Sequence, residues 1–323
     1  MSNLKNKKIK ILIIGYGRSG KRYFNIIKNF NDLNVFVFPS TNIKKKYLGK
    51  KFITLQTAKD FKPDITLICT PANSHVKYAL IFSKLKSNII LEKPLSISTQ
   101  NLSKLRKIVS KNKLSFIVAY NLEYLDVIIK FHKLLKNIKF GKMYSIRINV
   151  GSHLSIWKNS KNYTQFSTSI KKLSGVILYE LSHELFFLHS IFKDIQIDNV
   201  FLKKISNLKI DFEDISILRL KCKKNNKVIF VNLIFDYINF LPTRDYEFIF
   251  EKGTIKIDLI QNKIKYTYKD NNKIYEYKGK NNIADTYKLL FQSFYISYKK
   301  NNILSNFNIS EKVINLINKI YRV

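Results

Sequence analysis

Residues 11–20 read Ile-Leu-Ile-Ile-Gly-Tyr-Gly-Arg-Ser-Gly, a short apolar run followed at once by three glycines in G-x-G-x-x-G spacing. A helical pattern of apolar residues begins near the third glycine. In this setting Gly15 permits a tight turn, Gly17 lets backbone N–H groups approach a pyrophosphate, and Gly20 lets the helix pack against the strand. The helix N-terminus adds unpaired N–H groups and a partial positive charge. The run therefore predicts a strand–turn–helix unit that binds a dinucleotide.

The charge of the chain is strongly positive. Its 323 residues include 58 basic and 22 acidic ones, a net charge of +36 that is by itself typical of nucleic-acid binders. Only seven of the basic residues are arginines, the type that suits bidentate phosphate and base contacts, and the lysines are spread along the whole chain. We interpret them as a solvated lysine surface and predict no nucleic-acid partner. The positive field should still speed the arrival of anionic small molecules.

No stretch reaches the ~18 consecutive apolar residues of a membrane helix, and residues 1–8 lack the apolar core of a signal peptide. Cys69 and Cys222 lie far apart in apolar surroundings, which is typical of buried, reduced thiols. We therefore expect a cytoplasmic protein that does not contact a membrane.

The first part of the chain alternates strands and helices. Strands are predicted at 9–14, 35–38, 64–69, 88–91 and 115–119, and helices at 18–30, 73–86 and 99–112. Continuous apolar strands separated by helices predict a parallel sheet covered on both faces. Residues 1–121 are therefore expected to form a Rossmann dinucleotide-binding domain in an α/β protein.

The pattern changes in residues 122–323. Helices are predicted at 122–136, 179–192, 285–299 and 309–320, with a strand at 142–150 and alternating strands between 199 and 277. This predicts an α+β domain with an open, mainly antiparallel sheet, which would bind the substrate. Because one face of such a sheet needs a cover, we expect a homodimer or homotetramer formed through it.

Ligands of parallel α/β sheets bind beyond the carboxyl ends of the strands. Two predicted strand ends carry reactive side chains: residues 69–75 read Cys-Thr-Pro-Ala-Asn-Ser-His, and residues 91–96 read Leu-Glu-Lys-Pro-Leu-Ser. Together with the glycine turn and with Leu-Ser-His-Glu at 181–184, these motifs resemble the Gfo/Idh/MocA oxidoreductase family of glucose–fructose oxidoreductase and inositol dehydrogenase. The resemblance extends over nearly the whole chain, through segments 151–157, 211–214 and 236–258.

This resemblance implies NAD(P)-dependent hydride transfer at a ring hydroxyl or ketone of a sugar, cyclitol or nucleotide sugar. It places Lys93 between nicotinamide and substrate, where an ammonium would stabilise negative charge on the reacting oxygen. It implies that Glu92 orients Lys93 or balances its charge, and that the peptide bond before Pro94 is cis. His183 matches the family's helix histidine, and a neutral imidazole suits removal of the hydroxyl proton.

The chain departs from the family pattern around His183. Tyr179 stands where an Asp is often found, and Glu180 follows it. On one continuous helix both would share a face with His183, so Glu180 could orient that ring and Tyr179 could donate a proton. Phe186 replaces a further acid, and Leu173-Ser174 replaces two glycines. These departures leave open an alternative, a dinucleotide-binding regulator with impaired catalysis.

The remaining site residues are expected at the turn and at the strand ends. The expected cofactor contacts are Gly15, Tyr16, Gly17, Arg18, Ser19, Gly20, Ser40, Thr41, Thr70, Pro71, Asn73, His75, Glu92 and Lys93. The expected substrate contacts are Lys93, Asn121, His153, Trp157, Tyr163 and His183, and no metal site is predicted.

The form of the cofactor depends on the second strand. NAD-binding chains carry an acid about 20 residues past the glycines, but residues 38–42 contain none, and Lys44, Lys45 and Lys46 follow. This favours NADP slightly over NAD. The 151–157 and 181–184 runs look like family members of bacterial surface-sugar synthesis, and reduction of a bilin on the same fold stays a further alternative.

Overall fold

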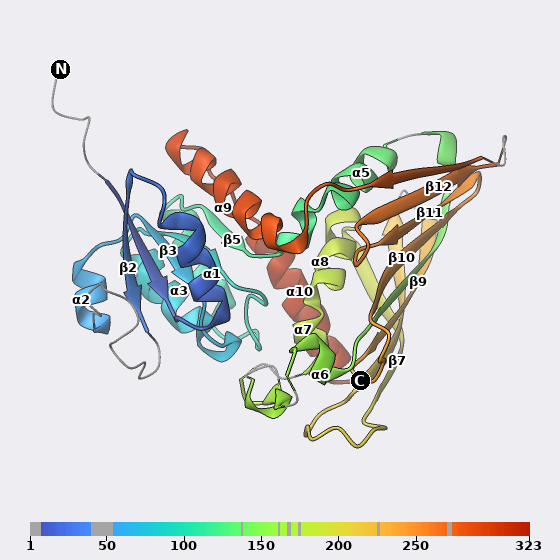
Figure 1. Ribbon diagram of the computed structural model, residues 1–323, viewed down its shortest axis with the longest axis horizontal. Coiled ribbons are helices and arrows are strands. Elements are labelled where there is room, and N and C mark those ends of the chain that lie inside the picture. Colours follow the sequence, from blue (N-terminus) through green and yellow to red (C-terminus); the bar gives the residue numbers. More distant parts are fainter. Residues whose placement is uncertain are drawn as a thin grey trace. The chain divides into compact units, whose positions relative to one another are not determined.

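The computed structural model divides into two compact units (Figure 1). It describes residues 8–39, 54–136, 138–160, 162–166, 169–173, 176–224, 227–269 and 273–323. Unit 1 comprises Met1–Ala119 and Tyr287–Ile314, and unit 2 comprises Tyr120–Thr286 and Asn315–Val323. Tyr287–Ile314 thus belongs to unit 1, whereas the division expected at residue 121 places it in the second domain.

Unit 1 is built on a five-stranded parallel sheet in the order β2-β1-β3-β4-β5. Its strands are β1 (Ile9–Ile14), β2 (Leu33–Phe38), β3 (Ile65–Ile68), β4 (Asn88–Leu91) and β5 (Phe116–Val118). Its first helices are α1 (Arg18–Ile27), α2 (Leu55–Asp60), η2 (Ala72–Ser74), α3 (His75–Lys84) and α4 (Leu102–Lys111). The predicted parallel Rossmann sheet is confirmed, and every residue of β3 is buried because both faces are covered.

The late segment of unit 1 covers the edge of its sheet. Helices α9 (Ile283–Lys299) and α10 (Phe307–Ile320) are joined by a loop that lies along β5. The Asn306 side chain accepts the N–H of Val118 at 2.8 Å and donates to its carbonyl at 2.9 Å. An uncovered edge strand would leave these groups unpaired, so the loop completes the sheet.

Unit 2 contains an eight-stranded sheet in the order β13-β12-β11-β10-β6-β9-β8-β7, in which only β6 and β9 pair in parallel. Its strands are β6 (Met143–Gly151), β7 (Asp194–Lys203), β8 (Ile215–Lys224), β9 (Lys227–Asp236), β10 (Thr243–Phe250), β11 (Gly253–Asp258), β12 (Lys263–Tyr268) and β13 (Ile274–Lys278). Its helices are η3 (Asn121–Tyr124), α5 (Asp126–Leu134), η4 (Ile138–Phe140), α6 (Leu154–Trp157), η5 (Tyr163–Gln165), α7 (Ile177–Glu180) and α8 (Ser182–Ile191). The predicted open, mainly antiparallel sheet is confirmed.

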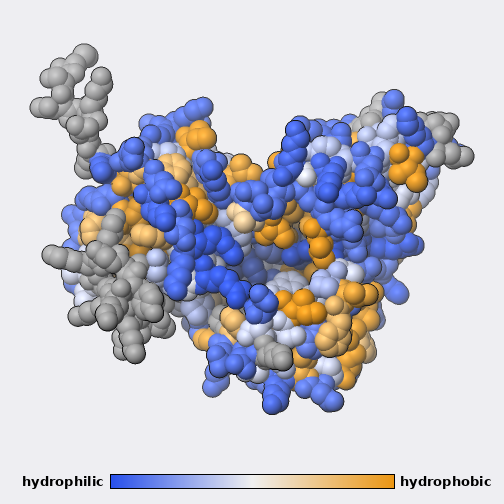
Figure 2. Space-filling view, in the orientation of Figure 1, coloured by the Kyte–Doolittle hydropathy of each residue, from blue (hydrophilic) through white to orange (hydrophobic). Residues whose placement is uncertain are grey.

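Helices α5 and α8 cover one face of this sheet. The Phe131 ring of α5 lies 4.2 Å from that of Phe248, and the Phe187 ring of α8 lies 5.1 Å from that of Tyr246. Strands β6, β8 and β9 alternate buried and exposed residues, so the other face is open. Most of the molecular surface visible in Figure 2 is hydrophilic. Among the described residues, no helix is both long and apolar enough to cross a membrane.

Two predicted helices of unit 2 need correction. The helix predicted at 179–192 is broken at Leu181, whose backbone angles (φ −97°, ψ 28°) end α7 before α8 begins. The one predicted at 122–136 begins as the 3₁₀ turn η3 and becomes α-helical only at Asp126. Apolar spacing persists through both breaks, which is why it does not reveal them.

A buried carboxylate organises the loop between β7 and β8. Asp214 is fully buried, and its two oxygens accept the N–H groups of Ile205 at 2.8 Å and Ser206 at 2.9 Å. The same loop carries Glu213, which accepts the N–H of Ile177 at the start of α7. Asp214 therefore helps to fix α7, next to the helix that carries His183.

We expect Asp214→Asn to lower the free energy of unfolding by about 1–3 kcal/mol, because the new NH₂ group cannot accept from a backbone donor. Denaturant unfolding monitored by circular dichroism measures this. The matched control is Asp211→Asn, an exposed residue of the same loop, which should change stability by no more than about 0.5 kcal/mol. Equal losses in the two variants would contradict the role of Asp214.

Candidate active site

The glycine turn after β1 has the close contacts that its spacing predicts. Gly15 has φ +87°, a left-handed conformation, and a Cβ there would lie 2.7 Å from the carbonyl oxygen of Cys69. A Cβ on Gly20 would lie 2.1 Å from the carbonyl oxygen of Gly15. The turn therefore packs β1, α1 and the end of β3 together without room for side chains.

The middle glycine faces open space instead. A Cβ on Gly17 would meet no atom within 4 Å. Gly17 caps α1, no side chain caps the helix, and its first turn contains no acid. A small cradle at a helix start, with no protein anion in it, fits the pyrophosphate of a dinucleotide. The sheet order reverses between β1 and β3, which is where such ligands bind.

The loops after β3 and β4 meet at His75. This ring is 1% exposed; its Nε2 lies 2.8 Å from the carbonyl oxygen of Thr70 and its Nδ1 lies 2.8 Å from that of Pro94. The Ser74 hydroxyl donates to Oγ1 of Thr70 at 2.7 Å. The Lys93–Pro94 peptide bond is cis, as the resemblance implies. Lys93 thus follows β4 on a loop that is tied to the loop after β3.

Glu92 belongs to a second group of side chains at these strand ends. Burial, and then the charge of Glu92, raises the pKa of the Tyr23 phenol on α1 and of the Cys69 thiol at the end of β3. The positive charge of Arg22 opposes this in both cases. Tyr23 and Cys69 are therefore neutral at pH 7, and Glu92 lies close to both.

His183 lies in unit 2, near the start of α8, among aromatic rings. The edge of its ring packs against Tyr120, with centroids 5.5 Å apart, and Phe186 stacks on the same tyrosine at 4.0 Å. Burial raises the pKa of Tyr120, which is therefore a neutral phenol. Phe186, at a position where the resemblance implies an acid, thus packs against the ring that contacts His183.

The break at Leu181 changes the roles expected for Tyr179 and Glu180. Both lie on α7, so the argument that they share a helix face with His183 does not hold. Glu180 forms a largely buried ion pair with Lys158, with 3.5 Å between Oε2 and Nζ. Burial raises the pKa of Tyr179 to about 12, so this phenol stays protonated at neutral pH.

The expected substrate residues of unit 2 make contacts within their own unit. Asn121 is buried and donates to the Thr286 hydroxyl at 2.7 Å. His153 caps α6, with its Nδ1 2.8 Å from the Ser155 hydroxyl, and its ring stacks on Phe240. Trp157 packs edge-on against Tyr237, and the Tyr163 hydroxyl accepts the N–H of Lys209.

The sequence analysis did not assign a role to a buried carboxylate next to His183. Glu184 is fully buried, and its Oε1 accepts from Arg244 at 2.6 and 2.8 Å and from the Tyr246 hydroxyl at 2.8 Å. This network attaches α8 to β10 directly beside His183. The sequence signal was the position of Glu184 next to that histidine, since its partners Arg244 and Tyr246 lie 60 and 62 residues away along the chain.

The other expected cofactor residues lie at the glycine turn, in η2 or outside the described residues. Tyr16, Arg18 and Ser19 lie at the turn and at the start of α1, and Asn73 lies exposed in η2. Ser40 and Thr41 lie outside the described residues, as do Lys44 to Lys46. Where the structure describes the chain, no three His, Cys, Asp or Glu side chains gather as metal ligands.

Comparison with known proteins supports this picture. A family model described as "Oxidoreductase family, NAD-binding Rossmann fold", that of Gfo/Idh/MocA, matches residues 9–120. Glucose-6-phosphate 3-dehydrogenase of Bacillus subtilis (strain 168) is 23% identical over 189 residues, 55% of this chain and 53% of that protein. The match thus spans about half the length of that relative.

Solved structures share the fold over almost the whole chain. UDP-N-acetylglucosamine 3-dehydrogenase from Acidithiobacillus ferrooxidans superposes with a TM-score of 0.79 at 13% identity, covering 98% of this chain and 96% of that one. A levoglucosan dehydrogenase in complex with NADH and levoglucosan gives a TM-score of 0.81 at 14% identity, covering 98% and 97%. Identities this low establish the fold. Residues 9–120 thus match the Gfo/Idh/MocA oxidoreductase family, and the whole chain shares the fold of these dehydrogenases.

Proposed function

We propose that this protein is an NAD(P)-dependent oxidoreductase that transfers a hydride between nicotinamide and a ring hydroxyl or ketone of a sugar, cyclitol or nucleotide sugar. The observation that carries the proposal is the position of Lys93. It follows β4, in the same parallel sheet as the open glycine cradle after β1, so both lie at the carboxyl edge of the sheet. This shared edge supports the proposal that Lys93 acts on an oxygen of a substrate bound next to the dinucleotide.

The residues of the chain supply the rest of the chemistry. A bound nicotinamide would take up or deliver the hydride. The Lys93 ammonium would donate a hydrogen bond to the reacting oxygen and stabilise the negative charge that develops there. His183, if its ring is neutral, can accept the hydroxyl proton. With Glu180 engaged by Lys158 and Tyr179 protonated, neither is available to replace it as a base.

The substrate class rests on the relatives. The compared proteins are named as dehydrogenases of glucose 6-phosphate, of UDP-N-acetylglucosamine and, in a complex with its substrate, of levoglucosan. We propose a substrate of the same kind, in the synthesis of surface sugars. We also propose a cytoplasmic location, which two free cysteines support.

The preference for NADP is part of the proposal. It rests on the sequence after β2, where no acid is available for a ribose hydroxyl and three lysines follow. A 2′-phosphate would meet cationic side chains there instead of a carboxylate.

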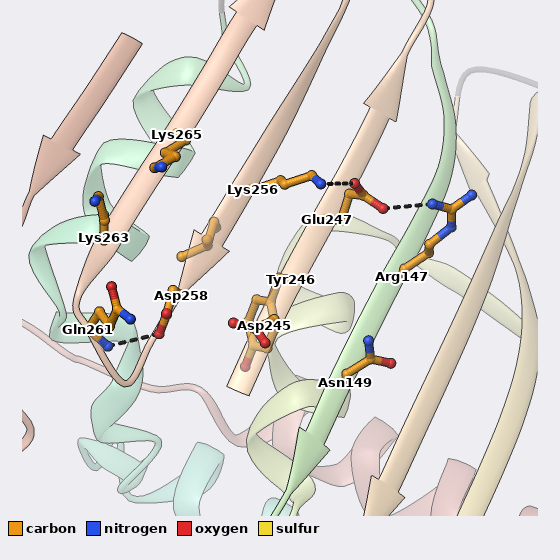
Figure 3. A pocket seen from close by; sticks show the side chains of 11 residues that line it. Arg147, Asn149, Asp245, Tyr246, Glu247, Lys256, Asp258, Gln261, Lys263 and Lys265 are labelled. Atoms are coloured by element: carbon orange, nitrogen blue, oxygen red, sulfur yellow. Dashed lines mark hydrogen bonds and ion pairs between the residues drawn. The ribbon is translucent and has the colours of Figure 1, made fainter. Parts of the chain in front are cut away.

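A homodimer through the open face of the unit 2 sheet completes the proposal. One half of this face exposes apolar side chains, each between 39% and 47% exposed: Phe201, Ile217, Val228, Phe230 and Ile234. The other half holds a groove of about 430 Å³ with charged walls, in which Glu247 pairs with Arg147 at 2.8 Å and with Lys256 at 3.0 Å (Figure 3). An open sheet face with exposed apolar side chains is a candidate interface between two copies of the chain.

We propose that three charged residues of this face set the register of the dimer. Asp245 and Asp258 face each other across β10 and β11, and among the described residues neither forms an ion pair. Burial, and then the charge of Asp258, raises the pKa of Asp245. Arg219 on β8 is exposed on the same face. A two-fold axis along β6 would place β8 of one protomer over β11 of its partner, because each lies two strands from β6.

Gly17→Ala should leave the fold intact and weaken cofactor binding at least tenfold, because its methyl group would occupy the open cradle. Gly20→Ala is the contrast: its Cβ would collide with the carbonyl oxygen of Gly15, so it should lower the midpoint of thermal unfolding. Fluorescence titration with NADPH and NADH measures both affinities. We expect tighter binding of NADPH, and tenfold tighter binding of NADH would contradict this preference.

Lys93→Ala should lower kcat by about 10²–10³-fold while the Kd of the cofactor changes little, because a donor to the transition-state oxygen is lost. The assay follows NAD(P)H absorbance with a panel of sugars, cyclitols and nucleotide sugars. Biliverdin is included to test the alternative activity, reduction of a bilin. Lys104→Ala, an exposed lysine of α4, is the matched control. Cofactor binding without turnover of any substrate by the wild type would favour the regulator instead.

Arg219→Asp should dissociate the dimer, because it adds a third acid to a register that already holds Asp245 and Asp258. Adding Asp245→Lys to that variant should restore association by exchanging the charges. Sedimentation velocity measures the mass of each variant, with Lys104→Asp as a control away from the sheet. A monomeric wild-type protein would exclude this interface.

A further inference from the structure

His75 makes contacts that neither its position at the start of a helix nor its burial requires. Its two ring nitrogens each lie 2.8 Å from a main-chain carbonyl oxygen, that of Thr70 after β3 and that of Pro94 after β4. The first loop is expected to contact the cofactor, and the second carries Lys93. A single side chain therefore connects the cofactor loop with the loop of the reactive lysine.

Carbonyl oxygens only accept hydrogen bonds, so each contact needs an N–H on the ring. An imidazolium supplies two and a neutral imidazole supplies one. Burial lowers the pKa of His75, the Pro94 and Thr70 carbonyls raise it, and the nearby charge of Lys93 lowers it, with a net shift downward. The Lys93 ammonium is the one charged group among these influences. The ring is therefore neutral at pH 7, and its single N–H is shared between the two carbonyls as the ring exchanges tautomers.

We propose, resting on the function proposed above, that His75 is a positioning residue for Lys93. It acts through the carbonyl of Pro94, the residue that directly follows the lysine. Its contact with the carbonyl of Thr70 fixes the position of the Lys93 loop relative to the loop that is expected to contact the cofactor. Ser74 supports the second contact, since its Oγ lies 2.7 Å from Oγ1 of Thr70 and 2.9 Å from the carbonyl oxygen of Pro71.

Two amide substitutions separate the two contacts. The side-chain nitrogen of Asn lies as many bonds from Cα as Nδ1 of histidine, and that of Gln as many as Nε2. His75→Asn can therefore still donate to the Pro94 carbonyl, and His75→Gln can still donate to the Thr70 carbonyl.

We expect His75→Asn to keep kcat within about threefold and to raise the Kd of the cofactor about tenfold, because this variant can no longer donate to the Thr70 carbonyl. His75→Gln should show the reverse, with kcat about tenfold lower and the Kd within about threefold. A role in packing alone would change both parameters together. The control is His132→Gln, on α5 of unit 2, which should leave kcat and Kd unchanged.

Thermal unfolding of the His75→Asn, His75→Gln and His132→Gln variants checks that all three fold. The proposal is supported if the Kd changes mainly in His75→Asn and kcat mainly in His75→Gln. Equal changes of both parameters in the two variants, or no change, would overturn it. If the wild type binds cofactor but turns over no substrate, the proposed function fails. The cofactor affinities of the Asn and Gln variants then still test the contact with Thr70.

Discussion

The close contact of backbone segments at residues 15, 20 and 69 is the constraint on which unit 1 depends. The Gly15 carbonyl occupies the space where residue 20 would carry a side chain, and the Cys69 carbonyl does the same for residue 15. Only glycine allows both contacts, so β1, α1 and β3 are held at a separation that other residues would increase. Because the strands are parallel, this contact also places the loops after β1, β3 and β4 at one edge of the sheet.

A chain of contacts runs from these glycines to the lysine. Cys69 packs on the turn, and the next residue, Thr70, holds His75, which in turn holds the carbonyl of Pro94 beside Lys93. Each link is a backbone group or a buried ring, so little conformational freedom is left along it. The same glycines that open a cradle at Gly17 therefore also contribute to the position of the catalytic lysine in the proposed mechanism.

The sequence predicted those parts of the fold that depend on neighbouring residues in the chain. The parallel strands of unit 1 and the alternating strands of unit 2 follow from the spacing of apolar residues, and the glycine roles follow from a motif. The break at Leu181 and the return of α9 to the first unit depend on contacts between distant residues. Glu184 and Arg244, and likewise Lys158 and Glu180, are pairs of this kind, which a single sequence does not reveal.

The departures from the family around His183 form a consistent arrangement of their own. Where the resemblance implies acids, Phe186 stacks on Tyr120 and Tyr179 is a buried phenol. The acids that are present, Glu180 and Glu184, each face a cation. Removing one partner of a buried ion pair is costly, so these carboxylates are bound into the structure and cannot readily turn toward His183. Proton transfer in the proposed reaction would therefore depend on His183 in an aromatic setting, with Lys93 providing the positive charge.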